Sequence, residues 1–187
     1  TGGSYNDITS IFVLMSDTPH IKSSWSLSYI LSNIDIKPSQ GDALAIGLGE
    51  ENMHILYQEL RDDVTGIERV GLMYAHGKEW NPSWSFQYSV GDSASNAQLE
   101  VYQVNDKDVL AATWVEKSDG ASKVAYVVTD NLWSADAPEY IEANGMTKLI
   151  MSENNGKISL IYDEINVFGP MTRYGVLDKV NQEFALS

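Results

Sequence analysis

A strand–turn–strand unit that recurs about every 50 residues is the feature that most limits the possible folds of this chain. In each unit, a short segment rich in β-branched and aromatic residues is followed by an Asp, Asn, Gly or Pro turn and a second such segment. The first segments are residues 8–16, 53–60, 108–117 and 157–164, and the second are residues 24–31, 68–75, 122–129 and 172–178. Segments of this length and composition predict strands, so we expect an all-β chain.

Further alternating segments flank these pairs. Residues 43–48, 98–104 and 148–151 precede the first strand of three units, and residues 84–90 and 138–142 follow the second strand of two units. Four antiparallel strands in about 50 residues are typical of a β-propeller blade. The sequence therefore predicts a β-propeller, or a propeller segment, of about four four-stranded blades, with an antiparallel β-sandwich as the alternative.

A small residue occupies the same place in the second strand of every unit. These residues are Ser26, Gly71, Ala125 and Gly175. A small side chain at a fixed place in a strand predicts the close approach of a neighbouring sheet. Trp114, in the middle of an apolar strand, is assigned to the core.

We expect residues 1–187 to form a single all-β domain, because this length suits one hydrophobic core and no linker divides the chain. Only residues 1–7 precede the first strand, so the first blade lacks its leading strand. The chain is expected either to close a small ring in which its two ends share a sheet, or to be one part of a larger propeller. In the second case, exposed sheet edges favour homo- or hetero-oligomers.

The formal net charge of −14 limits the possible partners. Nucleic acids and anionic membranes repel a domain of this sign, so neither is expected as a partner. The chain has no cysteine, which excludes thiol nucleophiles, thiolate metal sites and disulfide scaffolds. It begins at Thr1 rather than Met, which favours an exported protein with an extracellular or cell-surface location.

Residues 53–84 and 109–141 each place a strand, a turn, a second strand and a tryptophan in the same order. In this order they resemble blades of the sialidase-like and fucose-lectin-like β-propellers. The resemblance implies a propeller fold and sugar recognition. Residues 129–133 keep the Asp and the Trp of the family's aspartate box without its glycine, and His54 stands where the lectin pattern places an arginine.

Sialidase chemistry, as the resemblance implies, needs three arginines that converge on a carboxylate. The chain has three, Arg61, Arg69 and Arg173. Two of them flank one turn and the third belongs to another unit, so a converging triad is not expected. No catalytic residue is assigned, and a non-catalytic protein is favoured.

Neither the histidines nor the acidic turns match a known metal motif. His20, His54 and His76 fall in different units with no paired spacing, and His76 is assigned to a solvated loop, so no cofactor is expected. Residues 61–63 and 105–108 bring carboxylates close together in short turns. A structural calcium ion is therefore the alternative to solvated turns.

A group of aromatic and polar residues after the second strand of the second unit, with one tryptophan of the third, predicts the ligand site. The predicted ligand-binding residues are Trp80, Trp84, Tyr88, Glu79, Asn81, Gln87 and Trp133. The spacing of four between the aromatic residues of the second unit places them on one side of an extended chain, where rings can stack on a saccharide. The alternative is that these rings seal the interface between adjacent sheets.

Three functions follow from these observations. The first is an exported, non-catalytic propeller module that binds a glycan or surface polymer through aromatic-lined pockets between blades. The second is a structural subunit of a surface layer, filament or multi-chain propeller, with a protein as its partner. The third is a fragment of a sialidase-like glycoside hydrolase whose catalytic groups lie partly on another portion.

Overall fold

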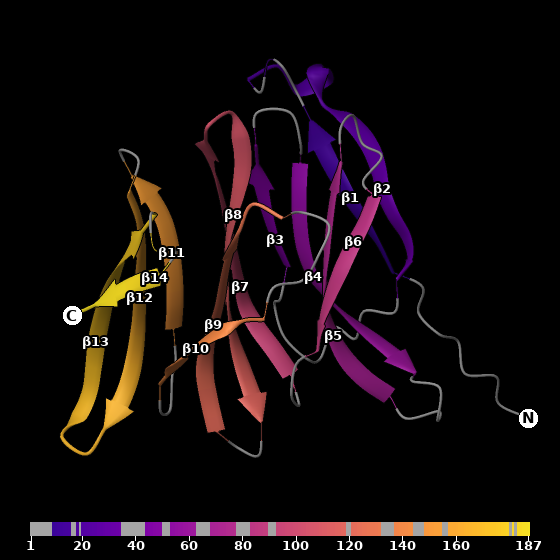
Figure 1. The fold of residues 1–187 in the computed structure, drawn as a ribbon. Helices are drawn as coiled ribbons and strands as arrows, with labels where there is room; N and C mark the ends of the chain where they lie inside the picture. Colours follow the sequence, from indigo (N-terminus) through magenta and orange to yellow (C-terminus); the bar gives the residue numbers. More distant parts are fainter. Residues whose placement is uncertain are drawn as a thin grey trace, which may run out of the picture.

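A computed structural model of the chain contains strands throughout, gathered into four groups (Figure 1). It describes residues 9–15, 18, 20–34, 44–49, 53–62, 68–77, 83–89, 93–118, 121–131, 137–143, 148–154, 157–179, 181 and 183–187. Within these ranges the single helical element is a 3-10 turn, η1 (Lys22–Ser24). No helix in this described part of the chain is long and apolar enough to cross a membrane.

Each group is built from strands that are consecutive in the sequence. The N-terminal hairpin contains β1 (Thr9–Met15) and β2 (Ser26–Ile34). The N-terminal sheet contains β3 (Leu44–Leu48), β4 (Met53–Asp62), β5 (Glu68–Gly77) and β6 (Ser83–Ser89). The middle sheet contains β7 (Ser93–Val104), β8 (Lys107–Ser118), β9 (Ala121–Thr129) and β10 (Glu139–Glu142). The C-terminal sheet contains β11 (Lys148–Asn154), β12 (Lys157–Asn166), β13 (Gly169–Asp178) and β14 (Glu183–Leu186).

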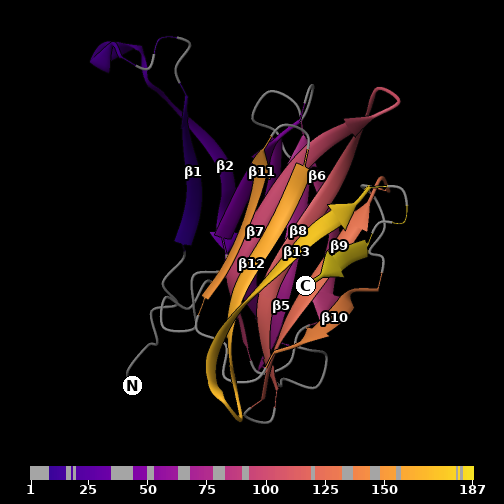
Figure 2. The same cartoon turned by 90° about the vertical axis from the view of Figure 1, so that its left-hand side faces the viewer.

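In all three four-stranded sheets, each strand pairs antiparallel with the next strand in the chain. The three sheets stand side by side. The first strand of the middle sheet, β7, contacts the first strands of the other two sheets, β3 and β11. The N-terminal hairpin and the C-terminal sheet lie at opposite ends of this row (Figures 1 and 2). The fold is therefore an all-β propeller segment, and the two-sheet sandwich is wrong. Closure into a ring stays a prediction.

The hydrophobic core occupies both faces of the middle sheet. Ala112 and Trp114 of β8 pack toward the N-terminal sheet, whereas Ala111 and Val115 pack toward the C-terminal sheet. Because β8 is covered on both faces, its sequence is a nearly continuous apolar run rather than an alternating one. The assignment of Trp114 to the core is confirmed, since this side chain is fully buried.

The repeated small residues do not all have the predicted role. Ala125 is fully buried in the core shared with the N-terminal sheet, as expected. At Gly175, however, an added Cβ would meet the Leu186 side chain at 2.9 Å, and Leu186 is its partner on β14. The close neighbour there is a paired strand of the same sheet, so the prediction is wrong for Gly175. The side chains of Ser26 and residue 71 lie outside the described part of the structure.

The close approach of two sheets occurs instead at Gly47, on β3. An added Cβ there would lie 2.8 Å from a Val101 methyl group on β7. Only a glycine therefore lets β3 lie against β7 at this point.

Two hairpin turns show how short polar residues set the strand register. Asn105 and Asp106 have φ angles of 51° and 60°, and positive φ at both central residues is the type I′ pattern that joins β7 to β8. Between β12 and β13, the Phe168 N–H donates to Asn166 Oδ1 at 2.8 Å, and Gly169 has a φ of 117°. These turns fix the pairing of long strands in the middle sheet and in the C-terminal sheet.

Candidate functional site

The predicted aromatic ligand site is described only in part. Glu79, Trp80, Asn81 and Trp133 lie outside the described residues. Trp84, Gln87 and Tyr88 belong to β6, whose backbone is described, but their side chains are not among the described ones. The assignment of these residues to a ligand site therefore stays a prediction.

The register of β6 bears on the spacing that supported this assignment. Tyr88 pairs with Leu72 of β5, and Trp84 pairs with Ala75, with a register shift between Tyr74 and Ala75. Four residues on β6 thus correspond to three on β5, which is the mark of a β-bulge. Since side chains alternate with a period of two, the argument from regular spacing does not hold across this bulge.

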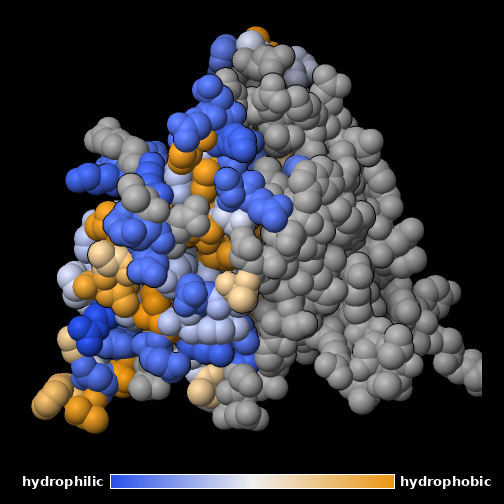
Figure 3. Space-filling model, viewed as in Figure 1, coloured by the Kyte–Doolittle hydropathy of each residue, from blue (hydrophilic) through white to orange (hydrophobic). Residues whose placement is uncertain are grey.

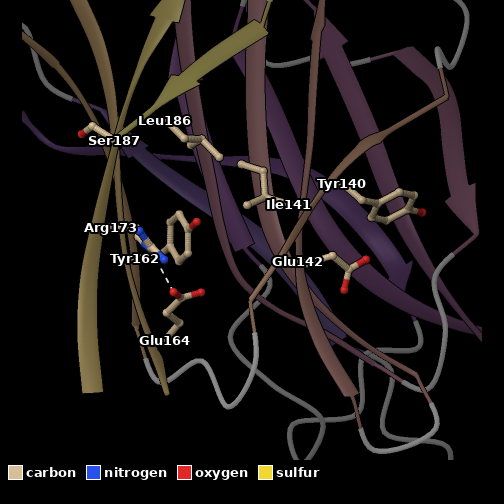
Figure 4. Close-up of a pocket in the computed structure, with 8 residues that line it drawn as sticks. All are labelled: Tyr140, Ile141, Glu142, Tyr162, Glu164, Arg173, Leu186 and Ser187. Atoms are coloured by element: carbon tan, nitrogen blue, oxygen red, sulfur yellow. Dashed lines mark hydrogen bonds and ion pairs between the residues drawn. The ribbon is translucent and has the colours of Figure 1, made fainter. Parts of the chain in front are cut away.

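A pocket of about 410 Å³ opens between the middle and C-terminal sheets (Figure 4). It is lined by Tyr140, Ile141, Glu142, Tyr162, Glu164, Arg173, Leu186 and Ser187. Four strands supply these residues: the edge strand β10 of the middle sheet, and β12, β13 and the edge strand β14 of the C-terminal sheet, with Ser187 following β14. The pocket is therefore an inter-sheet site of the kind expected from the sequence, but it is formed by other residues.

The polar wall of the pocket is built by β12 and β13. Tyr162 and Arg173 are direct cross-strand partners, and Glu164 lies two residues further along β12 on the same face. The Arg173 Nε–H donates to Glu164 Oε1 at 2.8 Å. The Glu164 side chain is only 12% exposed, whereas the Arg173 side chain is 39% exposed. This charge-assisted bond holds Arg173 in place while its remaining N–H groups can bind a ligand.

The electrostatics of this wall come from the same residues. Burial raises the pKa of the Tyr162 hydroxyl above its ordinary value, and the Glu164 carboxylate adds to this increase. The hydrogen bond that Arg173 donates to Glu164 raises the pKa of the Arg173 guanidinium. At neutral pH the wall thus offers a neutral phenol, a cation and a carboxylate within one hairpin.

The opposite wall is apolar and belongs to β10 and β14. The Ile141 and Leu186 side chains point toward each other, while Tyr140 and Glu142 point to the other side of β10 (Figure 4). Tyr140 is 42% exposed, and Lys123 Nζ lies 3.6 Å from the centre of its ring. A ligand in the pocket would contact a polar wall on one side and an apolar wall on the other.

The three arginines do not form a common site. Arg61 and Arg69 are direct cross-strand partners on β4 and β5 of the N-terminal sheet, whereas Arg173 belongs to the C-terminal sheet. Within the described residues, no group of three His, Asp or Glu side chains could hold a metal ion.

A buried polar cluster joins the N-terminal and middle sheets. His54 and His76 are direct cross-strand partners on β4 and β5, and both are buried, so the assignment of His76 to a solvated loop is wrong. His54 Nε2 lies 3.2 Å from Asp108 Oδ2, and His54 Nδ1 lies 2.7 Å from the Tyr74 hydroxyl. With Asp108 as acceptor, the neutral His54 donates through Nε2 and accepts from Tyr74 through Nδ1.

Burial lowers the pKa of both histidines below the ordinary value of 6.5, although the Asp108 carboxylate opposes this effect. The Asp108 carboxylate also accepts a hydrogen bond from Gln103, and it fills the space that a side chain at Gly49 would need. Asp108 was one of the residues of the acidic turn considered for calcium; its carboxylate instead connects β8 to β4. The His54, Tyr74 and His76 side chains are buried, so we assign the cluster a structural role.

Sequence reasoning missed Tyr162, Glu164 and Arg173 as site residues. It began the second strand of the fourth unit too late, at residue 172 instead of Gly169. A two-residue turn between Asn166 and Gly169 sets the β12–β13 register. That register alone would have placed Arg173 opposite Tyr162 and near Glu164.

Comparison with known proteins gives a likeness of fold only. No protein-family model matches the chain. No curated protein matches its sequence. The resemblance to sialidase-like and fucose-lectin-like propellers therefore stays a prediction at the level of sequence.

Several solved structures are similar in outline. A mannose phosphorylase from Leishmania mexicana has a TM-score of 0.49 and 12% identity, with 88% of this chain and 54% of that chain covered. A GH32 β-fructofuranosidase of Bombyx mori has a TM-score of 0.44 and 14% identity, with 87% and 40% covered. A glycosyl hydrolase from Bacteroides ovatus has a TM-score of 0.40 and 10% identity, with 98% and 59% covered. The chain thus spans about half the length of these structures, and no activity follows from likenesses this distant.

Proposed function

We propose that the chain is a glycan-binding propeller module and that the pocket between the middle and C-terminal sheets is its binding site. The observation that supports this most is the Arg173–Glu164 pair, held at 2.8 Å beside the buried ring of Tyr162 and opposite an apolar wall. Location outside the cell, as the sequence predicts, is part of the same proposal.

The arrangement suits the chemistry of a sugar. Hydroxyl groups of a saccharide both donate and accept hydrogen bonds, so a guanidinium and a carboxylate fixed side by side can bind neighbouring hydroxyls. The C–H face of the ring is apolar and can pack on Ile141 and Leu186 of the other wall. A pocket with a few fixed polar groups and an apolar wall is the usual form of a small-molecule site.

Replacing Arg173 by alanine is expected to lower the affinity for a bound glycan at least about tenfold, because hydrogen bonds to a charged group contribute about 1.5–3 kcal/mol. A glycan array identifies the ligand, and titration calorimetry with that ligand measures the affinity. Lys157→Ala is the matched control, because Lys157 is an exposed cation at the start of β12 and does not line the pocket. Equal binding by the Arg173→Ala variant and the unchanged protein, or no binding to any glycan on the array, would contradict the proposal.

A second function, assembly with another copy of the chain, is favoured by the outer face of the C-terminal sheet. Along β12, the residues that alternate with the buried ones are partly exposed, and orange patches are visible over this sheet in Figure 3. The exposed apolar residues of this face and its hairpin tip include Ile150, Ile161, Ile165, Val167, Phe168 and Tyr174. The equivalent face of the middle sheet is covered by the C-terminal sheet. A sheet from a second copy of the chain can cover the exposed face of the C-terminal sheet in the same way.

This second function predicts a dimer in solution that separates when the face is made polar. Val167 and Phe168 are each 93% exposed, so their replacement by serine costs the isolated chain little. Sedimentation equilibrium of the unchanged protein and of a Val167→Ser, Phe168→Ser variant tests this. A monomer of 20.7 kDa at every concentration of the unchanged protein would overturn it.

A further inference from the structure

A second pocket, of about 320 Å³, lies between the same two sheets. It is lined by Tyr126, Val127, Val128, Ala137, Glu139, Asn181 and Glu183. Its lining includes three carboxylate and amide side chains and one tyrosine. The two pockets thus have similar chemistry, and both are bordered by the edge strands β10 and β14.

The order of the lining residues places the two pockets in a line. The second pocket is bordered by Glu139 and Glu183, near the starts of β10 and β14. The first is bordered by Ile141 and Leu186, nearer the ends of the same strands. Glu139 and Ile141 are two residues apart and share a face of β10. At about 3.3 Å per residue, the offset between the pockets is about 7 Å along β10 and about 10 Å along β14.

The partition between the pockets is apolar and fixed. Phe184 of β14 contacts the Tyr126 ring edge-on, with 5.3 Å between ring centres. Phe184 and Ile141 are each only 8% exposed and belong to the core between the two sheets. Buried apolar side chains of both sheets therefore lie between the two pockets and hold the edge strands β10 and β14 against each other.

The charge of this line is negative. Its negatively charged side chains are Glu139, Glu164 and Glu183, and Glu142 adds a fourth carboxylate on the other side of β10. Among the lining residues that the structure describes, Arg173 is the one cation, and it already bonds Glu164, while Lys123 lies over the ring of Tyr140. A uronic acid or sialic acid would meet like charges here, which disfavours binding.

We infer that the two pockets are consecutive subsites of one groove, and that this groove binds an extended, uncharged oligosaccharide rather than a single or an acidic sugar. The inference rests on the proposed glycan-binding function and specifies its ligand. It follows from the alignment of both pockets along β10 and β14 and from the excess of carboxylates that line them.

Oligosaccharide length provides the first test. Titration calorimetry with an uncharged oligosaccharide series, starting from the sugar found on the array, is expected to show an affinity increase of at least about tenfold from the disaccharide to longer chains. Ala137→Trp fills the second pocket from an exposed position on its wall. This variant is expected to remove the gain for long chains and to leave the disaccharide affinity unchanged.

Charge provides the second test. Removing two carboxylates with Glu139→Gln, Glu183→Gln is expected to raise the affinity for an acidic oligosaccharide at least about tenfold relative to the affinity for an uncharged one of the same length. Asp106→Asn, which makes the same chemical change in the exposed β7–β8 turn, is the control and is expected to change neither affinity. Urea unfolding of each variant confirms that the fold is intact.

The outcomes separate this inference from the proposed function. No binding of any sugar overturns both. Binding that is equally tight for a disaccharide and for long chains, or that is unaffected by Ala137→Trp, overturns the extended groove and leaves the single-pocket function intact. Tighter binding of the acidic series by the unchanged protein overturns the predicted preference for uncharged ligands.

Discussion

Replacing Trp114 by alanine is expected to lower the free energy of unfolding by about 3–5 kcal/mol. The Trp114 side chain is fully buried in the core between the N-terminal and middle sheets, where Leu56 and Tyr74 come from one sheet and Leu110 and Ala125 from the other. Its removal leaves a cavity between two sheets, and paired strands cannot collapse into it. A loss of this size is a large part of the about 5–15 kcal/mol that stabilises a typical domain.

Urea unfolding followed by far-ultraviolet circular dichroism measures this loss without relying on tryptophan fluorescence. Trp25→Ala is the matched control, because Trp25 is 45% exposed and leaves no closed cavity. The Trp114→Phe variant, which keeps one ring in the core, is expected to fall between the two. If Trp114→Ala and Trp25→Ala lowered stability by similar amounts, Trp114 would not be the main contact between these sheets.

The strands were predictable because their signals are local. Residues 108–117 were expected to form a buried strand from composition alone, and the structure places β8 at Lys107–Ser118. The last strand, β14, was not predicted, because Glu183–Leu186 is too short for its alternation to stand out. The contact of Phe184 with Tyr126 depends on the packing of two sheets, which no local pattern in the sequence indicates.

The candidate site was less predictable, because its residues become neighbours only through sheet register and sheet packing. Glu164 and Arg173 are joined by the β12–β13 register, which a correct turn assignment would have given. Ile141 and Leu186 belong to different sheets, and no local pattern indicates that the edges of those sheets enclose a pocket. A group of aromatic residues is a stronger local signal of a sugar site than a single arginine, so the sequence predicted a site at Trp84 instead.

The pairing of the two buried histidines was hidden for a similar reason. His54 and His76 lie opposite each other only because β4 and β5 pair along their whole length. Asp108, which bonds His54, comes from another sheet. Because it lies close to the type I′ turn at Asn105 and Asp106, the sequence pattern predicted a solvated side chain. Polar residues buried between sheets carry no periodic signal, since their partners are distant in the sequence.

The same cluster predicts that stability falls as the pH is lowered below about 6.5. Burial lowers the pKa of His54 and of His76 in the folded chain, so the unfolded chain binds protons first as the pH falls. Their stabilising effect is complete above the unfolded value of 6.5 and is lost between 6.5 and the lowered pKa of the folded state. In that window, each histidine that is protonated only when unfolded changes the free energy of unfolding by about 1.4 kcal/mol per pH unit.

Urea unfolding between about pH 7.5 and about pH 5.5 measures this slope. The groups that face His54 are Tyr74 and His76 of β5 and Asp108 of β8, and the attraction of Asp108 opposes the effect without reversing it. His76→Gln removes one titrating group and is expected to reduce the slope by about 1.4 kcal/mol per pH unit, whatever its effect on stability at neutral pH. His20→Gln is the control, because His20 is exposed. A slope that is flat or of opposite sign, or one that His76→Gln leaves unchanged, would show that the buried histidines are not the groups that titrate on unfolding.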